Sequence, residues 1–371
     1  MDLKSILGSS STHPIILSLH FVLLKLNLSK FYSTFLLALC CVVIPLYVSN
    51  LGFMKGGPFF PTLTRISSIG TLSEETKDWT IKDYITYYYT FDSTKNRKHL
   101  RKKYKRLLKE DPNNAQALNY FARSSVIHNK SISYHAKLLA HILFNTILVC
   151  SVGYYLHYYE ADWKPRSWTL LDLTDLNLVK NNVIFGIGLF AMINISHSFW
   201  GYLVALVFKC PYYFAMNYPF FATSLQDFWG NRCKLNSQTF LKRLAYDIVL
   251  KFFGYTKESK KKPPKSIKLL GFIGTFFLSG ILHEYLLLVM GFETHLEQLG
   301  FFMLHSMLVI LEGLVVDFIY NITGYHLIRD SPWIVKVVYT NLVLLYTSPL
   351  MFNAYLTGGM YTELVLDQLQ L

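Results

Sequence analysis

Hydrophobic residues gather in long runs that polar connections separate. The runs lie near residues 14–29, 32–53, 136–158, 182–208, 269–292, 299–321 and 334–357. Most have the length that a helix needs to cross the hydrocarbon core of a bilayer, so the pattern predicts an all-α polytopic membrane protein with about seven to nine transmembrane helices. The first run is short and carries Lys25, and we expect it to stay as an anchor rather than to be cleaved as a signal peptide.

Composition agrees with a membrane protein. Hydrophobic residues make up 52% of the chain and charged residues 16%, whereas an average soluble domain has about 25% charged residues. The 28 Phe and 26 Tyr residues suit helix interfaces and the aromatic belts at the headgroups. The five cysteines show no paired spacing, so we expect neither a disulfide framework nor a bound metal.

Basic residues orient the predicted bundle, because Lys and Arg accumulate in cytoplasmic connections. The stretch Lys95 to Lys109 holds nine of them and the stretch Lys257 to Lys268 holds six. The loop 293–298 has two acidic residues and no Lys or Arg, which places it on the lumenal side. The basic residues that give the chain its net charge of +13 are thus expected to lie in connections beside the membrane. Anionic headgroups or a phosphorylated substrate are the expected partners, nucleic acid is not, and a plain topology signal explains the charge equally well.

The alternation of polar and apolar regions divides the chain into three parts. Residues 1–55 are predicted to be N-terminal anchor helices, residues 56–134 a cytosolic basic and aromatic region, and residues 135–371 the membrane core. Inside the core, an aromatic stretch that contains Pro219 is too short to span and runs directly into a charged segment. This pattern is typical of a re-entrant or interfacial element.

Two titratable side chains, His283 and Glu284, interrupt the run Leu269 to Phe292, which is otherwise uncharged over 24 residues. Ionisable groups at membrane depth mark cavities and reaction sites by default, and a structural pair between packed helices is the alternative. Small and polar residues precede the histidine at intervals of four on one helix face, where a neighbouring helix or a ligand is expected to approach closely: Gly271, Thr275 and Ser279.

The next run carries His305 and Glu312, which are seven residues apart and therefore near one helix face. Together with the preceding run it could wall a polar interior. No motif surrounds His305 or His197, so a structural role is the preferred interpretation of both.

Two short motifs give the most specific signal. Ser224 to Gly230 reads SLQDFWG, and Ser279 to Glu284 reads SGILHE. Their order in a multispanning chain resembles the wax synthase branch of the membrane-bound O-acyltransferase superfamily, over residues 215–290. The resemblance implies a membrane-bound O-acyltransferase-like bundle that moves an acyl group from acyl-CoA to a hydroxyl. A long-chain alcohol that becomes a wax ester is the first choice of acceptor.

The resemblance places the catalytic histidine on His283, and a neutral imidazole is suited to take a proton from an alcohol. Glu284 lies about 100° around the helix, so we expect it to pair with another helix or to shape the cavity rather than to orient His283. Contacts with substrate are predicted for side chains of the two motifs: Asp227, Trp229, Arg232, Ser279 and Glu284.

The family's first motif has the form DFWGRRWN, from which this sequence departs at three positions. Asn231 replaces the first Arg, Cys233 replaces Trp, and Lys234 stands at the position of Asn. On a helix Asn231 and Lys234 lie one turn apart, and either could stabilise the oxyanion of a tetrahedral intermediate. A lipid-binding scaffold with a degenerate site is the alternative. A transporter should need polar residues on several spans, and only 269–292 and 299–321 show them.

The chemistry requires acyl-CoA as co-substrate and no further cofactor. Basic residues near the expected cytosolic mouth could contact its phosphates, although a solvated helix face explains them equally well: Arg232, Lys234, Lys242 and Arg243. A lipophilic alcohol and membrane lipids are the other expected partners. Diacylglycerol, sterol or metabolite acceptors and an acetyl donor stay open. We expect an integral membrane protein of the endoplasmic reticulum.

Overall fold

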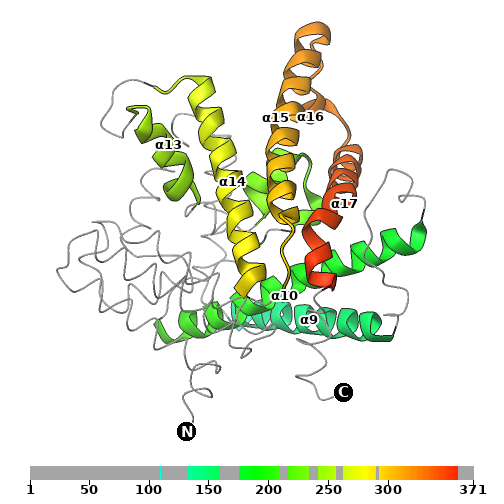
Figure 1. Cartoon of the computed structure of the whole chain (residues 1–371). Helices are drawn as coiled ribbons and strands as arrows, with labels where there is room; N and C mark the ends of the chain where they lie inside the picture. The colour runs from blue at the N-terminus through cyan, green and yellow to red at the C-terminus, as the bar shows by residue number, and fades with distance from the viewer. Residues whose placement is uncertain are drawn as a thin grey trace, which may run out of the picture.

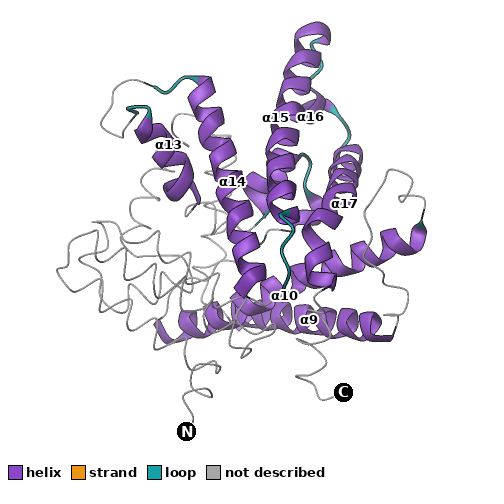
Figure 2. Cartoon of the chain, viewed as in Figure 1, coloured by secondary structure: helices purple, strands orange, loops and turns teal. Residues whose placement is uncertain are grey.

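The computed structural model describes residues 109, 132–158, 175–208, 216, 218–233, 241–255, 262–289 and 292–357. Every regular element in these ranges is a helix (Figure 2). Among the described residues, four helices are long and apolar enough to cross a membrane: α9 (Ile132–Tyr158), α14 (Lys265–Val289), α15 (Glu297–Thr323) and α17 (Trp333–Thr357). The all-α membrane class is thus confirmed. The runs 14–29 and 32–53, and nearly all of residues 1–134, lie outside the described part.

Three helices stand side by side, and two others run across their lower ends (Figure 1). The upright helices are α14, α15 and α17, and the crossing helices are α9 and α10 (Leu176–Phe208). A buried apolar cluster joins the two groups, with Phe185 of α10 packed among Leu286 of α14 and Tyr355 of α17. The runs 136–158 and 182–208 are therefore helical as predicted, but their crossing direction is a new feature.

Local sequence sets where the upright helices begin, end and bend. Pro264 precedes α14 and accepts the first helical hydrogen bond, from the N–H of Lys268 at 3.2 Å. Gly324 ends α15 in the left-handed region with φ 70°, where a residue without Cβ is unstrained. Pro349 lies inside α17 and has no N–H to donate to the Leu345 carbonyl. The Ser348 hydroxyl donates to that carbonyl instead, at 2.7 Å.

Small residues let neighbouring helices approach α14 closely. A Cβ on Gly280 would lie 2.8 Å from the Leu299 Cα of α15, and one on Gly271 would lie 2.8 Å from the Tyr246 ring. Tyr246 belongs to the π-helical turn η7 (Lys242–Tyr246), which is followed by α13 (Asp247–Phe252). Helix packing thus accounts for Gly271 in the predicted small-residue face.

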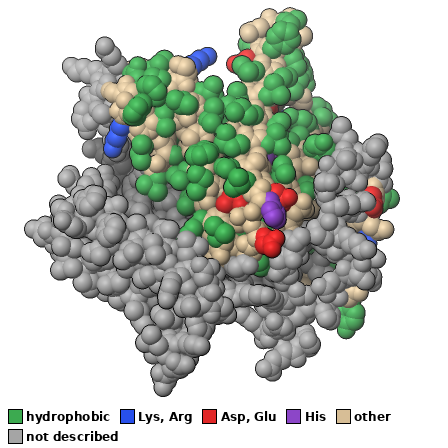
Figure 3. Space-filling view, in the orientation of Figure 1, with side chains coloured by type: hydrophobic (Ala, Val, Ile, Leu, Met, Phe, Trp, Pro, Cys, Tyr) green, Lys and Arg blue, Asp and Glu red, His purple; other side chains and the backbone are tan. Residues whose placement is uncertain are grey.

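Charged residues mark opposite ends of the upright helices. Exposed Lys262, Lys265 and Lys268 lie at the start of α14, whereas Glu293 lies in the connection from α14 to α15. Figure 3 shows a largely hydrophobic face with basic side chains, and some acidic atoms beside them, near its upper end, and with acidic side chains and a histidine in its lower part. This arrangement agrees with the predicted charge asymmetry of the bundle.

A short helix, α16 (Leu327–Asp330), connects α15 to α17 at the end where α14 begins. Asp330 accepts a hydrogen bond from the His326 N–H at 2.8 Å and pairs with the Arg329 guanidinium at 2.7 Å. The Arg329 hydrogen bond, followed by that of His326, lowers the pKa of this exposed carboxyl to about 2. Asp330 thus stays charged at any physiological pH.

Buried polar residues also occur on the helices where none were expected. They lie on α9, α10 and α17: Asn145, Asn181, Asn182, Asn194, Ser198, Thr340, Thr347 and Ser348. The expectation that only residues 269–292 and 299–321 carry polar groups was therefore wrong. Several of these groups bond to their own helix, as Thr340 does to the Lys336 carbonyl at 2.9 Å, so they sit inside an apolar run without interrupting it.

Candidate active site

The first motif folds into a tight chain of short helical turns. They are η5 (Pro219–Phe221), α11 (Leu225–Asp227) and the π-helical turn η6 (Phe228–Arg232). Ser224 caps α11 by accepting the Asp227 N–H at 2.9 Å, and Asp227 Oδ2 accepts the Thr223 N–H at 3.1 Å. This reciprocal arrangement is a variant of the capping box, in which two side chains satisfy backbone groups that the helix leaves unpaired.

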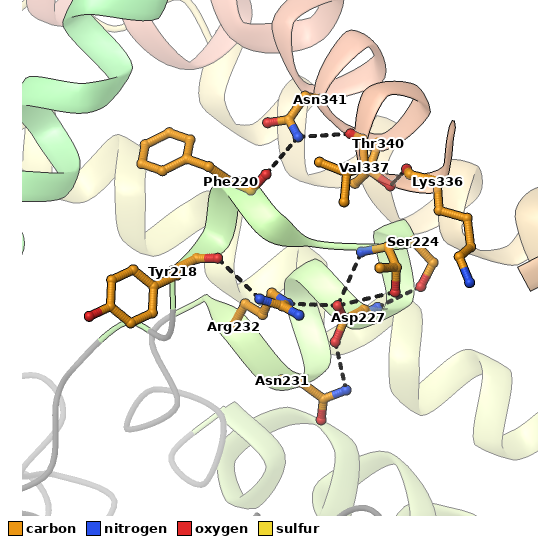
Figure 4. A network of polar contacts seen from close by, with 11 residues as sticks. Tyr218, Phe220, Ser224, Asp227, Asn231, Arg232, Lys336, Val337, Thr340 and Asn341 are labelled. Carbon is orange, nitrogen blue, oxygen red and sulfur yellow. Dashed lines mark hydrogen bonds and ion pairs between the residues drawn. The ribbon is translucent and has the colours of Figure 1, made fainter. Parts of the chain in front are cut away.

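Asp227 is the centre of the polar network within this segment (Figure 4). Its Oδ2 accepts the Arg232 Nε–H at 2.6 Å, and its Oδ1 accepts the Asn231 Nδ2–H at 3.1 Å. Arg232 also donates through Nη1 to the Tyr218 carbonyl at 3.3 Å. Three predicted site residues thus bond to one another and close the segment on itself.

We expect Asp227→Asn to destabilise the protein, because the amide removes the negative charge that Arg232 faces. Hydrogen bonds to charged groups contribute about 2 kcal/mol each, which is the expected loss in the free energy of unfolding. The measurement is thermal unfolding in detergent. Asp317→Asn is the control, because Asp317 is exposed on α15. Equal melting temperatures for the two variants would contradict the role of the network.

The motif segment, residues 218–232, lies at mid-depth of the upright helices. It bonds to Glu312, which is eleven residues before the end of α15 at Thr323, or about 16 Å along the helix axis. It also bonds to α17, where the Asn341 Nδ2–H donates to the Phe220 carbonyl at 2.8 Å (Figure 4). Non-helical backbone at this depth requires internal hydrogen-bond partners. The position agrees with the predicted re-entrant element.

His283 is held in one tautomer by its own helix. Its Nδ1 lies 2.8 Å from the Ser279 carbonyl oxygen. Because a carbonyl can only accept, Nδ1 must carry the proton, and in the neutral ring the basic nitrogen is then Nε2. The ring contacts the Phe302 ring of α15, with 4.5 Å between centroids. The Ser279 carbonyl and the Phe302 ring thus both orient the side chain that the sequence predicts as the base.

Phe302 joins the two motifs. Its ring also contacts the Trp229 ring, with 5.5 Å between centroids. Trp229 packs further against Phe276 of α14 at 5.4 Å and Phe301 of α15 at 6.1 Å. The rings of His283 and Trp229 therefore both pack against the Phe302 ring. Sequence reasoning did not single out Phe302, because one more aromatic residue in an apolar run carries no local signal.

Glu284 pairs with another helix, as expected. Its Oε1 accepts the Leu299 N–H in the first turn of α15 at 3.0 Å, and the residue is 6% exposed. The capping residue of that helix, Leu296, has no side chain able to do this. Glu284 thus stabilises the start of α15, and its contact with substrate stays a prediction.

The remaining predicted residues fall in different places. Lys242 is exposed on η7, and Ser279 is buried on α14. Lys234 and the side chains of Arg243 and His197 lie outside the described part of the chain. Within the described residues, no group of three or more His, Cys, Asp and Glu side chains could hold a metal ion.

Comparison with known proteins assigns a class to this segment. Residues 211–304 match the model of the membrane bound O-acyl transferase family. The matched range contains the SLQDFWG and SGILHE motifs, the whole of α14 and the first turns of α15, including Phe302. This match, together with the long-chain-alcohol O-fatty-acyltransferase relatives given next, confirms the predicted resemblance to the wax synthase branch of that superfamily.

Three relatives, all from Arabidopsis thaliana, are similar to parts of the chain. Acyl-CoA–sterol O-acyltransferase 1 is 39% identical over 75 residues, which are 20% of each chain. Probable long-chain-alcohol O-fatty-acyltransferase 1 is 27% identical over 162 residues, 43% of this chain and 42% of the relative. Putative long-chain-alcohol O-fatty-acyltransferase 10 is 27% identical over 130 residues, 35% of this chain and 37% of the relative. The matched segments thus span less than half of these relatives.

Proposed function

We propose that this protein is a membrane O-acyltransferase that moves an acyl group from acyl-CoA to the hydroxyl of a lipophilic acceptor. The observation that carries the proposal is the orientation of His283, whose Nδ1 bonds to the Ser279 carbonyl at 2.8 Å within the family-matched segment. That bond leaves Nε2 as the atom that would receive a proton. A base held in this way is what acyl transfer to an alcohol needs.

The proposed reaction has two steps. Nε2 of His283 takes the proton of the acceptor hydroxyl while its oxygen attacks the thioester carbonyl carbon. The tetrahedral intermediate then collapses, the carbon–sulfur bond breaks, and the imidazolium returns the proton to the leaving CoA thiolate. Asn231 or Lys234 is the proposed donor to the oxyanion. The reaction uses no further cofactor.

The acceptor that we propose first is a long-chain alcohol, which gives a wax ester. Support comes from the names of the long-chain-alcohol relatives, whereas the sterol acyltransferase supports a sterol as the second candidate. The proposed location is the endoplasmic reticulum membrane, with the basic connections in the cytosol. Reconstituted protein given palmitoyl-CoA and either hexadecanol or a sterol distinguishes the two acceptors, and ester formation with neither would contradict both.

Lys234 tests whether the site is active or degenerate. If the site has merely decayed, Lys234→Asn, which restores the family residue, is expected to raise the rate of ester formation severalfold. If Lys234 itself donates to the oxyanion, the substitution replaces a charged donor by a weaker neutral one and the rate is expected to fall. Lys262→Asn, at an exposed lysine before α14, is the control for the loss of one positive charge. If neither the wild type nor Lys234→Asn forms ester, the scaffold alternative replaces the enzyme.

A further inference from the structure

The motif segment is held in place by two side chains on one face of α15. The first is Glu312, which is 8% exposed. Its Oε1 accepts the Leu225 N–H at 3.1 Å, and its Oε2 accepts the Gln226 N–H at 3.2 Å. These N–H groups lie at the start of α11, where the helix itself provides no acceptor. Glu312 thus fixes the point at which α11 begins.

The second side chain is His305, which is fully buried. The indole N–H of Trp229 donates to His305 Nδ1 at 3.1 Å. Because an indole N–H can only donate, Nδ1 is the acceptor and the ring proton lies on Nε2. Nε2 then donates to the Thr347 hydroxyl at 2.8 Å, and that hydroxyl donates to the Val343 carbonyl at 2.9 Å. His305 thus connects Trp229 to α17.

These contacts place α15 between the two motifs. His305 and Glu312 are seven residues apart, or about 10 Å along the helix axis. Glu312 bonds to the start of α11, and His305 bonds to Trp229 in the following turn η6. Phe302 lies one turn before His305 on the same helix and contacts both His283 and Trp229. The helix α15 therefore contacts both the SLQDFWG segment, through His305 and Glu312, and the His283 ring, through Phe302.

We propose that His305 and Glu312 are positioning residues, which hold the 224–232 segment at a fixed height beside His283 so that acyl donor and acceptor meet the base in reactive geometry. The proposal rests on the proposed function for its catalytic part. Neither residue is assigned a contact with substrate. Both act through backbone or side-chain groups of the first motif. Loss of their hydrogen bonds would therefore change the position of that motif.

Kinetics of paired variants test the proposal. A displacement of about 1 Å in a reacting group lowers turnover by about 100-fold, so His305→Phe and Glu312→Ala are expected to lower kcat about 10- to 100-fold with little change in KM for acyl-CoA. His305→Gln retains an acceptor for the Trp229 indole and should restore most of the activity. In a Trp229→Phe background, where the indole N–H is absent, His305→Phe should have no further effect on kcat.

Gln298→Leu is the matched control. Gln298 is also fully buried on α15, but it bonds to the Met351 carbonyl at 3.2 Å and not to the motif segment. We expect this variant to accumulate less well while keeping its kcat per folded molecule. If Gln298→Leu lowers kcat as much as His305→Phe, or if His305→Gln fails to restore it, general loss of packing explains the effect and the proposal is overturned.

A second measurement does not depend on activity. Cys233 lies at the end of η6, so in a version with Cys233 as the sole cysteine its maleimide labelling reports how firmly the segment is held. We expect His305→Phe and Glu312→Ala to speed labelling at least threefold and Gln298→Leu to leave it unchanged. Faster labelling with unchanged kcat overturns the positioning role, as does unchanged labelling. If the wild type makes no ester, the proposed function fails and labelling alone decides whether α15 holds the segment.

Discussion

Replacing His283 by asparagine is expected to remove nearly all ester formation while the protein stays folded. The asparagine amide can donate to the Ser279 carbonyl as Nδ1 does at 2.8 Å, but it has no basic nitrogen in place of Nε2. General base catalysis contributes about 10²- to 10⁴-fold to rate, and kcat should fall by that factor. The measurement compares ester formed per folded molecule in purified wild type and variant.

Two further variants distinguish the loss of the base at His283 from damage to α14 and from the loss of the hydrogen bond to Ser279. Ile281→Ala changes an exposed residue on the same helix and should keep its activity, which controls for general damage to α14. His283→Ala loses both the base and the hydrogen bond to Ser279. Full turnover in His283→Asn, with loss only in His283→Ala, would mean that the ring serves as a structural donor and not as the base.

Replacing Gly280 by leucine is expected to prevent α14 and α15 from packing. A Cβ at this position already lies 2.7 Å from Leu299 Cδ1 and 2.8 Å from Leu299 Cα, and a backbone atom cannot rotate away as the end of a side chain can. Overpacking typically costs about 1 to 3 kcal/mol, and we expect the upper end of that range here because the clash includes a backbone atom. The measurement is the yield and melting temperature of monodisperse protein in detergent.

Gly313→Leu is the matched control for Gly280→Leu. Gly313 lies on α15, and a Cβ there meets no atom within 4 Å. Leucine also forms helices more readily than glycine, so this variant should be as stable as the wild type or more so. If both variants lose stability equally, the close approach of Gly280 to Leu299 does not limit the packing of the two helices.

The sequence predicted the helices of the membrane core well because their signal is local. The run 269–292 corresponds to α14 at Lys265–Val289, and the run 299–321 to α15 at Glu297–Thr323. Long apolar runs indicate that a helix forms, but they do not indicate how it is oriented relative to its neighbours. The crossing of α10 beneath the upright helices depends on contacts between residues that are distant in sequence, such as the rings of Phe185 on α10 and Phe352 on α17, whose centroids are 4.8 Å apart.

The candidate site shows the same division between local and distant information. His283 could be identified from its isolation in an apolar run and from the SGILHE motif. The link from Trp229 through Phe302 to His283 could not, because no spacing in the sequence relates these three residues. His305 and Glu312 were recognised as sharing a helix face, and His305 indeed has structural partners, the Trp229 indole and the Thr347 hydroxyl. Their joint hold on the first motif required the structure.

The most direct test of the central claim is an acyl transfer assay on membranes that contain the wild type or His283→Asn. Both are incubated with labelled palmitoyl-CoA or acetyl-CoA and a panel of lipophilic alcohols, and the neutral lipids are then separated. A labelled ester that forms with the wild type and disappears with His283→Asn is the predicted result, and it identifies the donor length and the acceptor together. An ester that forms equally with both proteins, or with neither, would contradict the assignment of His283 as the base of an O-acyltransferase.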